Sequence, residues 1–121
     1  MVVIQSFGFK YGLPTISDYL IDARVLINPF YVDELRQLTG NDKEVIEYIE
    51  NNFKTKDYLK YVEDILDFVI KELTRDGRGQ ITISVGCTGG RHRSVFLANR
   101  LAEYFTAKGV SVKAVHRDVD K

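Results

Sequence analysis

The 121-residue chain has little of what several classes of protein require. Its single cysteine excludes an intramolecular disulfide, and one cysteine with two histidines argues against a zinc site. Lysine plus arginine and aspartate plus glutamate number 17 each, so no overall positive charge draws the chain to nucleic acid. It has neither a run of about 18 apolar residues nor a signal-peptide pattern. We therefore expect a cytoplasmic protein that does not enter a membrane and has no metal site and no resident cofactor.

What the chain does contain is enough apolar sequence for one domain, spanning residues 1–121. Hydrophobic residues make up 45% of it and charged residues 28%, as in ordinary globular proteins. Strand-like and helical patterns alternate, which predicts an α/β fold with a mostly parallel sheet of about four strands flanked by helices. The predicted strands are Val2 to Ser6, Tyr19 to Ile27, Gln80 to Val85 and Val110 to Val115. The predicted helices cover about residues 43–53, 56–74 and 95–108.

The most informative segment is the loop at residues 86–94, Gly-Cys-Thr-Gly-Gly-Arg-His-Arg-Ser, between a predicted strand and a predicted helix. Backbone N–H groups in such a loop and in the first helical turn are unpaired, and the helix dipole adds partial positive charge. The two central glycines let the backbone approach a ligand closely. The basic side chains lie at the helix end where cations are disfavoured, so we expect an anion such as phosphate opposite them. The predicted phosphate-binding residues of this loop are Thr88, Gly89, Gly90, Arg91, His92, Arg93 and Ser94.

Polar clusters follow other predicted strands as well. Lys10 lies in a glycine-bearing loop after the first strand, and residues 116–118, His-Arg-Asp, follow the last. Arg24 lies two residues after Asp22, in or near the end of another strand. Ligands of open parallel sheets bind beyond the carboxyl ends of the strands. We therefore expect Lys10, Arg24 and Arg117 to add a second layer of positive charge to the same site.

Several short motifs run in one order along nearly the whole chain. They are SFGFKYGLP at 6–14, DAR at 22–24, NP at 28–29, LR at 35–36, LTG at 38–40, GCTGG at 86–90, HRSV at 92–95 and HRD at 116–118. In this order they resemble the C-terminal domain of the RapZ/YvcJ family. Members usually also carry an N-terminal domain with a Walker A loop. This chain has no Gly-x-x-x-x-Gly-Lys-Ser/Thr motif, so the resemblance does not extend to nucleotide hydrolysis.

The resemblance has implications for ligand and partners. It implies that the domain senses a phosphosugar, which is glucosamine 6-phosphate in the enterobacterial protein, and that it binds small RNA and presents it to a ribonuclease. Thr88, Gly89, His92 and Arg93 match the family's phosphate-binding loop. The implied partners are thus a phosphorylated small molecule or an RNA phosphate, a separate P-loop nucleotide-binding protein, and a second copy of the chain in a homo-oligomer.

The same loop also fits a catalytic hypothesis. Cys87, Arg93 and Ser94 form the Cys-x5-Arg-Ser signature of protein tyrosine phosphatases. The loop amides would stabilise a Cys87 thiolate, Arg93 would hold the phosphoryl oxygens, and Ser94 would assist the leaving thiolate. A general acid is also needed, and Asp22 and Asp118 are candidates by location only. Binding without catalysis is therefore the first hypothesis, and a Cys-dependent phosphatase is the alternative.

Each candidate also has a purely structural explanation. Cys87 at a strand end would be a small buried hydrophobe, and His92 would be a surface residue. Arg93 would pair with Asp22 or Asp118, which would also orient it for an anion. These explanations predict side-chain contacts that a structure can test.

Overall fold

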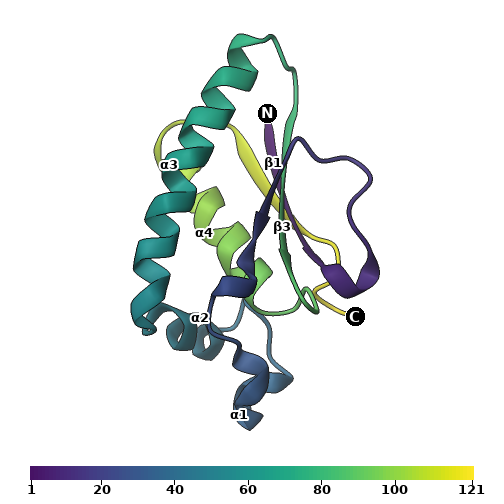
Figure 1. Ribbon diagram of the computed structural model, residues 1–121, viewed down its shortest axis with the longest axis vertical. Coiled ribbons are helices and arrows are strands. Elements are labelled where there is room, and N and C mark those ends of the chain that lie inside the picture. The colour runs from purple at the N-terminus through teal and green to yellow at the C-terminus, as the bar shows by residue number, and fades with distance from the viewer.

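Four parallel strands form the centre of the molecule (Figure 1). The computed structural model describes residues 1–121. Its strands are β1 (Val2–Gly8), β2 (Tyr19–Asp22), β3 (Ile81–Cys87) and β4 (Val112–His116), in the order β2-β3-β1-β4. Every neighbouring pair is parallel. The predicted α/β class, with a mostly parallel sheet of about four strands, is confirmed.

The helices gather on one face and at one end of the sheet. They are α1 (Asp33–Arg36), α2 (Lys43–Glu50), α3 (Phe53–Arg75) and α4 (Arg93–Ala107). The long α3 and α4 pack together beside the sheet, whereas α1 and α2 lie towards its carboxyl end (Figure 1). Three single-turn 3₁₀ helices precede α1 in the chain: η1 (Phe9–Tyr11), η2 (Ala23–Val25) and η3 (Pro29–Tyr31). None of the helices combines the length and the apolar character needed to cross a membrane.

The core lies between the sheet and the two long helices. Val62, Leu66 and Ile70 repeat every four residues along α3 and are buried, as expected for the apolar face of an amphipathic helix. They share one cluster of 20 buried residues with Ile4 of β1 and Ile83 of β3, among others. The central strands are therefore fixed by burial, and the register pairs Gly8 with Cys87 at their carboxyl ends. The loops that follow β1 and β3 consequently lie side by side.

The second strand is shorter than predicted. We expected it to run to Ile27, but it ends at Asp22. The Asp22 carboxylate accepts the backbone N–H of Arg24 and caps η2, and the Asn28 side chain accepts the N–H of Phe30 and caps η3. Such local side-chain acceptors offer the backbone an alternative to the sheet ladder, which explains why the strand stops early.

Candidate anion-binding site

A cavity of about 540 Å³ opens at the carboxyl end of the sheet. Its walls come from η1, from η3 and the residue before it, from the end of α1, from the loop after β3, and from Lys121. Five lining residues are lysine or arginine and none is aspartate or glutamate, although the chain as a whole is neutral. The lining residues are Lys10, Tyr11, Asn28, Phe30, Tyr31, Arg36, Gln37, Cys87, Thr88, Gly89, Arg91, His92, Arg93 and Lys121.

The loop between β3 and α4 supplies unpaired backbone donors. No N–H group from Thr88 to Val95 donates a hydrogen bond to an acceptor within the protein. The loop turns at Gly90, whose φ of 78° lies in the left-handed region that favours glycine. The neighbouring η1 is bonded to the loop, since the Lys10 N–H donates to the carbonyl of Thr88 at 3.1 Å. Free amides at the start of a helix are suited to holding an oxyanion.

Arg93 is the most buried cation of the cavity, with 6% of its surface exposed. Its Nη1 donates to the carbonyl oxygens of Arg24 at 2.9 Å and of Leu26 at 3.2 Å. Its Nε and Nη2 have no acceptor in the protein. Every fully buried side-chain nitrogen of the chain has a hydrogen-bond partner, so these two nitrogens must be accessible to solvent. Burial lowers the pKa of Arg93, but a guanidinium stays charged in proteins. No carboxylate pairs with it, so the structural pairing with Asp22 or Asp118 is absent.

The remaining cations of the cavity fall into two groups. Arg91 donates to the backbone oxygens of Gln37 and Lys121 but pairs with no aspartate or glutamate, and neither does Lys10. By contrast, Arg36 pairs with Asp33 at 2.9 Å and Lys121 with Asp118 at 2.9 Å. Three positive charges in the cavity, those of Lys10, Arg91 and Arg93, are therefore not paired with an aspartate or glutamate side chain.

His92 lines the cavity but does not supply the positive charge expected of it. The side chain is buried, and its Nε2 lies 3.2 Å from the carbonyl oxygen of Leu35. Burial lowers the pKa of His92 below its usual 6.5, so the ring is neutral near pH 7. His92 is therefore neither a surface residue nor positively charged at neutral pH; it contacts the loop's neighbour α1 at Leu35, near the end of that helix.

Arg24 and Arg117 lie outside the cavity, contrary to the second positive layer predicted for them. Arg24 pairs with Asp22 at 2.7 Å and stacks over the Phe9 ring at 4.0 Å. Arg117 is engaged by Asp118 and by the carbonyl oxygen of Gly12. Sequence reasoning had instead overlooked two cations that do line the cavity, Arg36 and Lys121.

Two loop residues of the predicted site, Gly90 and Ser94, form the back of the wall rather than its surface. A Cβ on Gly90 would come 2.6 Å from the Gly8 nitrogen, so the loop packs on β1 through backbone atoms alone. Ser94 is buried and accepts a hydrogen bond from the Cys87 thiol at 3.1 Å. Both residues contribute to the site by shaping it.

Comparison with known proteins confirms the family resemblance. Residues 1–120 match the RapZ C-terminal domain. The chain belongs to this family. It is 45% identical over 119 residues to a nucleotide-binding protein of Caldanaerobacter subterraneus, covering 98% of this chain and 42% of the relative. It is 45% identical over 121 residues to one from Clostridium botulinum, covering 100% of this chain and 41% of the relative.

A nucleotide-binding protein of Thermoanaerobacter is 46% identical over 119 residues, 98% of this chain and 42% of the relative. The chain thus spans about two fifths of the length of the relatives it matches, 41–42% in each case.

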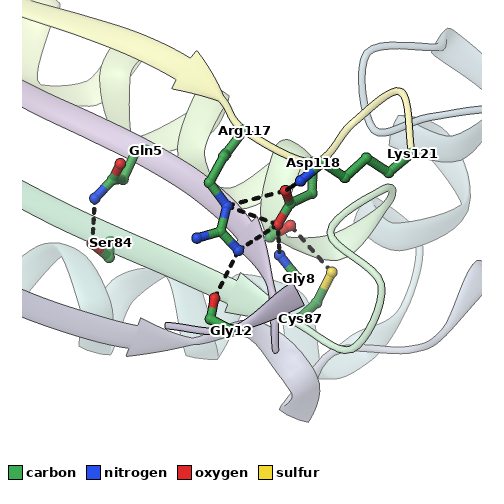
Figure 2. A network of polar contacts seen from close by, with 9 residues as sticks. Gln5, Gly8, Gly12, Ser84, Cys87, Arg117, Asp118 and Lys121 are labelled. Carbon is green, nitrogen blue, oxygen red and sulfur yellow. Dashed lines mark hydrogen bonds and ion pairs between the residues drawn. The ribbon is translucent and has the colours of Figure 1, made fainter. Parts of the chain in front are cut away.

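The catalytic alternative meets an obstacle in the two carboxylates proposed as general acids. The pKa of Asp22 is lowered, mainly by its hydrogen bond with Arg24, and the side chain does not reach the cavity. Burial opposes ionisation of Asp118, but hydrogen bonds from Arg117, Gly8 and Lys121 outweigh it and lower its pKa to about 2. Figure 2 shows Asp118 enclosed by these partners. Neither carboxyl carries a proton at neutral pH, so neither of them is suited to act as the general acid of the catalytic alternative.

No group of three or more histidine, cysteine, aspartate or glutamate side chains gathers closely enough to hold a metal ion. The arrangement can hold an oxyanion by amides and guanidinium groups.

Proposed function

We propose that the cavity binds the phosphate group of a phosphorylated small molecule without altering it. The observation that carries the proposal is the charge of the lining: five lysine or arginine side chains with no carboxylate, beside a loop of unpaired amides. Phosphate oxygens accept strong hydrogen bonds from guanidinium groups and from amides at a helix start. Arg93, with two donor nitrogens unused, would hold the deepest oxygen atoms.

Family membership narrows the ligand class. The resemblance implies a phosphosugar such as glucosamine 6-phosphate, and a cavity of about 540 Å³ is large enough for a ligand of that kind. The relatives are named nucleotide-binding proteins, but this chain covers only 41–42% of their length. We therefore assign phosphosugar sensing, rather than nucleotide hydrolysis, to this domain.

The test is a titration followed by calorimetry and by backbone amide chemical shifts. Glucosamine 6-phosphate and inorganic phosphate should both bind, with shifts at Thr88 to Arg93, and glucosamine without phosphate should not. Affinity should fall as salt is raised, because part of the binding energy is Coulombic. A glucosamine 6-phosphate titration with neither heat nor shift changes would refute the proposal.

A second candidate ligand is RNA, since aromatic rings line the cationic cavity. Phe30 is 51% exposed and Tyr31 79% exposed, and bases of single-stranded RNA stack on such rings. A short single-stranded RNA should then bind with an affinity that falls steeply and linearly on a log–log plot against salt. Replacing Tyr31 by alanine should weaken RNA binding but leave binding of inorganic phosphate unchanged.

The catalytic alternative is separated from binding by one substitution. The Cys87 thiol lines the cavity and lies 3.1 Å from the Ser94 hydroxyl, which could donate to a Cys87 thiolate in a phosphatase. A phosphatase would turn over an aryl phosphate at about millimolar concentration between pH 5 and 8, and Cys87→Ser would abolish turnover. Our proposal expects no turnover in either protein and nearly equal phosphate affinity in both.

A further inference from the structure

Asp118 is a fully buried carboxylate directly behind the phosphate-binding loop. It has 0% of its surface exposed. Oδ2 accepts the backbone N–H of Gly8 at 2.7 Å and the Nη2 of Arg117 at 2.8 Å, and Oδ1 lies 2.9 Å from the Nζ of Lys121 (Figure 2). One side chain from beyond β4 thus joins the end of β1 to the last residue of the chain.

These contacts reach the loop through close backbone packing. A Cβ on Gly8 would lie 2.5 Å from the carbonyl carbon of Gly89, and a Cβ on Gly90 would lie 2.8 Å from the Cβ of Asp118. Nothing larger than hydrogen fits between Gly8, the loop and Asp118. Fixing the Gly8 N–H therefore fixes the surface against which Gly89 and Gly90 rest.

The partner of Asp118, Arg117, ties down the other wall of the cavity. Its Nη2 donates to the carbonyl oxygen of Gly12 at 2.7 Å, while its Nε and Nη2 hold both carboxylate oxygens. Gly12 closes η1 by donating its N–H to Phe9, and η1 carries Lys10 and Tyr11 into the cavity. Arg117 thus acts at a distance from any ligand.

We propose that Asp118, with Arg117, is a positioning residue that sets the shape of the anion site, an inference that rests on the proposed function. It arranges the loop amides through Gly8 and Gly90, and it places Lys10 through Arg117 and Gly12. Charge alone argues the other way, because a carboxylate behind an anion site repels the anion. When the charge of Asp118 is removed, positioning therefore predicts weaker phosphate binding and electrostatics predicts tighter binding, which makes the proposal testable.

The experiment measures inorganic phosphate binding to Asp118→Asn. Asparagine keeps the size of the side chain but weakens the bonds to Gly8, Arg117 and Lys121. Positioning predicts affinity about three- to thirtyfold weaker, in the range of mutations that act on a site without touching its ligand. Electrostatics alone predicts tighter binding. The matched control is Asp67→Asn, the same charge change in a carboxylate bonded to Tyr104 and Lys108 away from the cavity, which should leave affinity unchanged.

Backbone amide shifts without ligand give an independent readout. Asp118→Asn should move the Gly8, Gly89 and Gly90 signals, and Asp67→Asn should not. Should Asp118→Asn fail to fold, Arg117→Lys takes its place, because lysine keeps the charge but cannot hold Asp118 and Gly12 together. It should weaken phosphate binding and shift the Lys10 and Tyr11 signals.

The outcomes separate the two proposals. Phosphate binding by a folded variant that equals or exceeds wild type overturns the positioning role and leaves the proposed function standing. If wild type binds neither phosphate nor glucosamine 6-phosphate, the proposed function fails, and the glycine shifts alone decide the positioning role. Unmoved Gly89 and Gly90 signals then overturn it.

Discussion

The cavity and the outer surface of the long helices differ in how their arginine side chains are paired. On the helices, four basic side chains pair with carboxylates: Lys60 with Asp64, Arg75 with Glu72, Lys108 with Asp67, and Arg100 with Glu50. In the cavity, Lys10, Arg91 and Arg93 have no such partner. The chain has zero net charge, yet its charges are unevenly distributed. Net charge excludes a generally basic protein but says nothing about where unbalanced cations gather.

The largest effect should come from removing the deepest unbalanced cation. Arg93→Ala should weaken phosphate binding by about a hundredfold, since each hydrogen bond to a charged group contributes about 1.5–3 kcal/mol. The control is Arg100→Ala on the same helix, whose arginine already pairs with Glu50, and calorimetry should show unchanged affinity. Circular dichroism must show that both variants fold. Equal losses of phosphate affinity in the two variants would show that the cavity arginine is no more important for binding than the paired arginine on the helix surface.

A second effect concerns the backbone that supports the cavity. Gly8→Ala should destabilise the fold by about 1–3 kcal/mol, as overpacking does, because the added carbon would meet the loop at Gly89. Gly79→Ala is the matched control, since a Cβ there has no neighbour within 4 Å. Urea denaturation measures the free energy of unfolding of both variants. A Gly8→Ala protein as stable as wild type would mean that the loop has room to move.

The pH dependence of stability should reflect the two histidines. Burial lowers the pKa of both His92 and His116, so the folded chain binds protons less readily than the unfolded chain. Their contribution is therefore complete above pH 6.5 and is lost as pH falls below it, by at most about 1.4 kcal/mol per pH unit for each histidine. Asp118, whose pKa falls from 3.8 to about 2, loses its contribution only between those values. Urea denaturation at pH 8, 6 and 5 should show the decline, and His92→Gln should reduce it.

The smallest effect is expected on the paired surface. Lys60→Ala breaks an exposed ion pair with Asp64, and such pairs contribute little to stability. The melting temperature and phosphate affinity should both stay near wild type. A clear loss of phosphate affinity in this variant would show that general positive charge, rather than the cavity, attracts the anion.

The sequence allowed the parallel sheet, the three longer helices and the loop after β3 to be predicted, because each rests on a local pattern, whereas the four-residue α1 was not predicted. Apolar periodicity marks α3, and the glycines and arginines between β3 and α4 mark the loop. The other cations could not be placed this way, because Arg36 and Lys121 reach the cavity only through the tertiary fold. Arg24 and Arg117 do not line the cavity, and the sequence held a signal for this. Each has an aspartate within two residues, which captures its guanidinium locally.

His92 illustrates a different limit. Its neighbours in sequence are arginines, which suggested a third cation of the loop. Burial lowers the pKa of His92 and outweighs the opposing hydrogen bond with the carbonyl of Leu35, and both depend on a segment far along the chain. The ionisation of a histidine depends on its three-dimensional surroundings, and those cannot be read from adjacent residues.

The pairing of the first strand has a consequence for thermal behaviour. β1 lies between β3 and β4, so Val2 meets both Ile81 and Val112. The walls of the cavity, drawn from the start, middle and end of the chain, therefore come together only when the whole polypeptide has folded. A compound that binds the cavity binds only the folded state and therefore stabilises it. At a free concentration one hundred times its Kd, it adds about 2.7 kcal/mol to the free energy of unfolding. A melting-temperature screen of phosphorylated metabolites would thus find ligands before any assay for their biological effect exists.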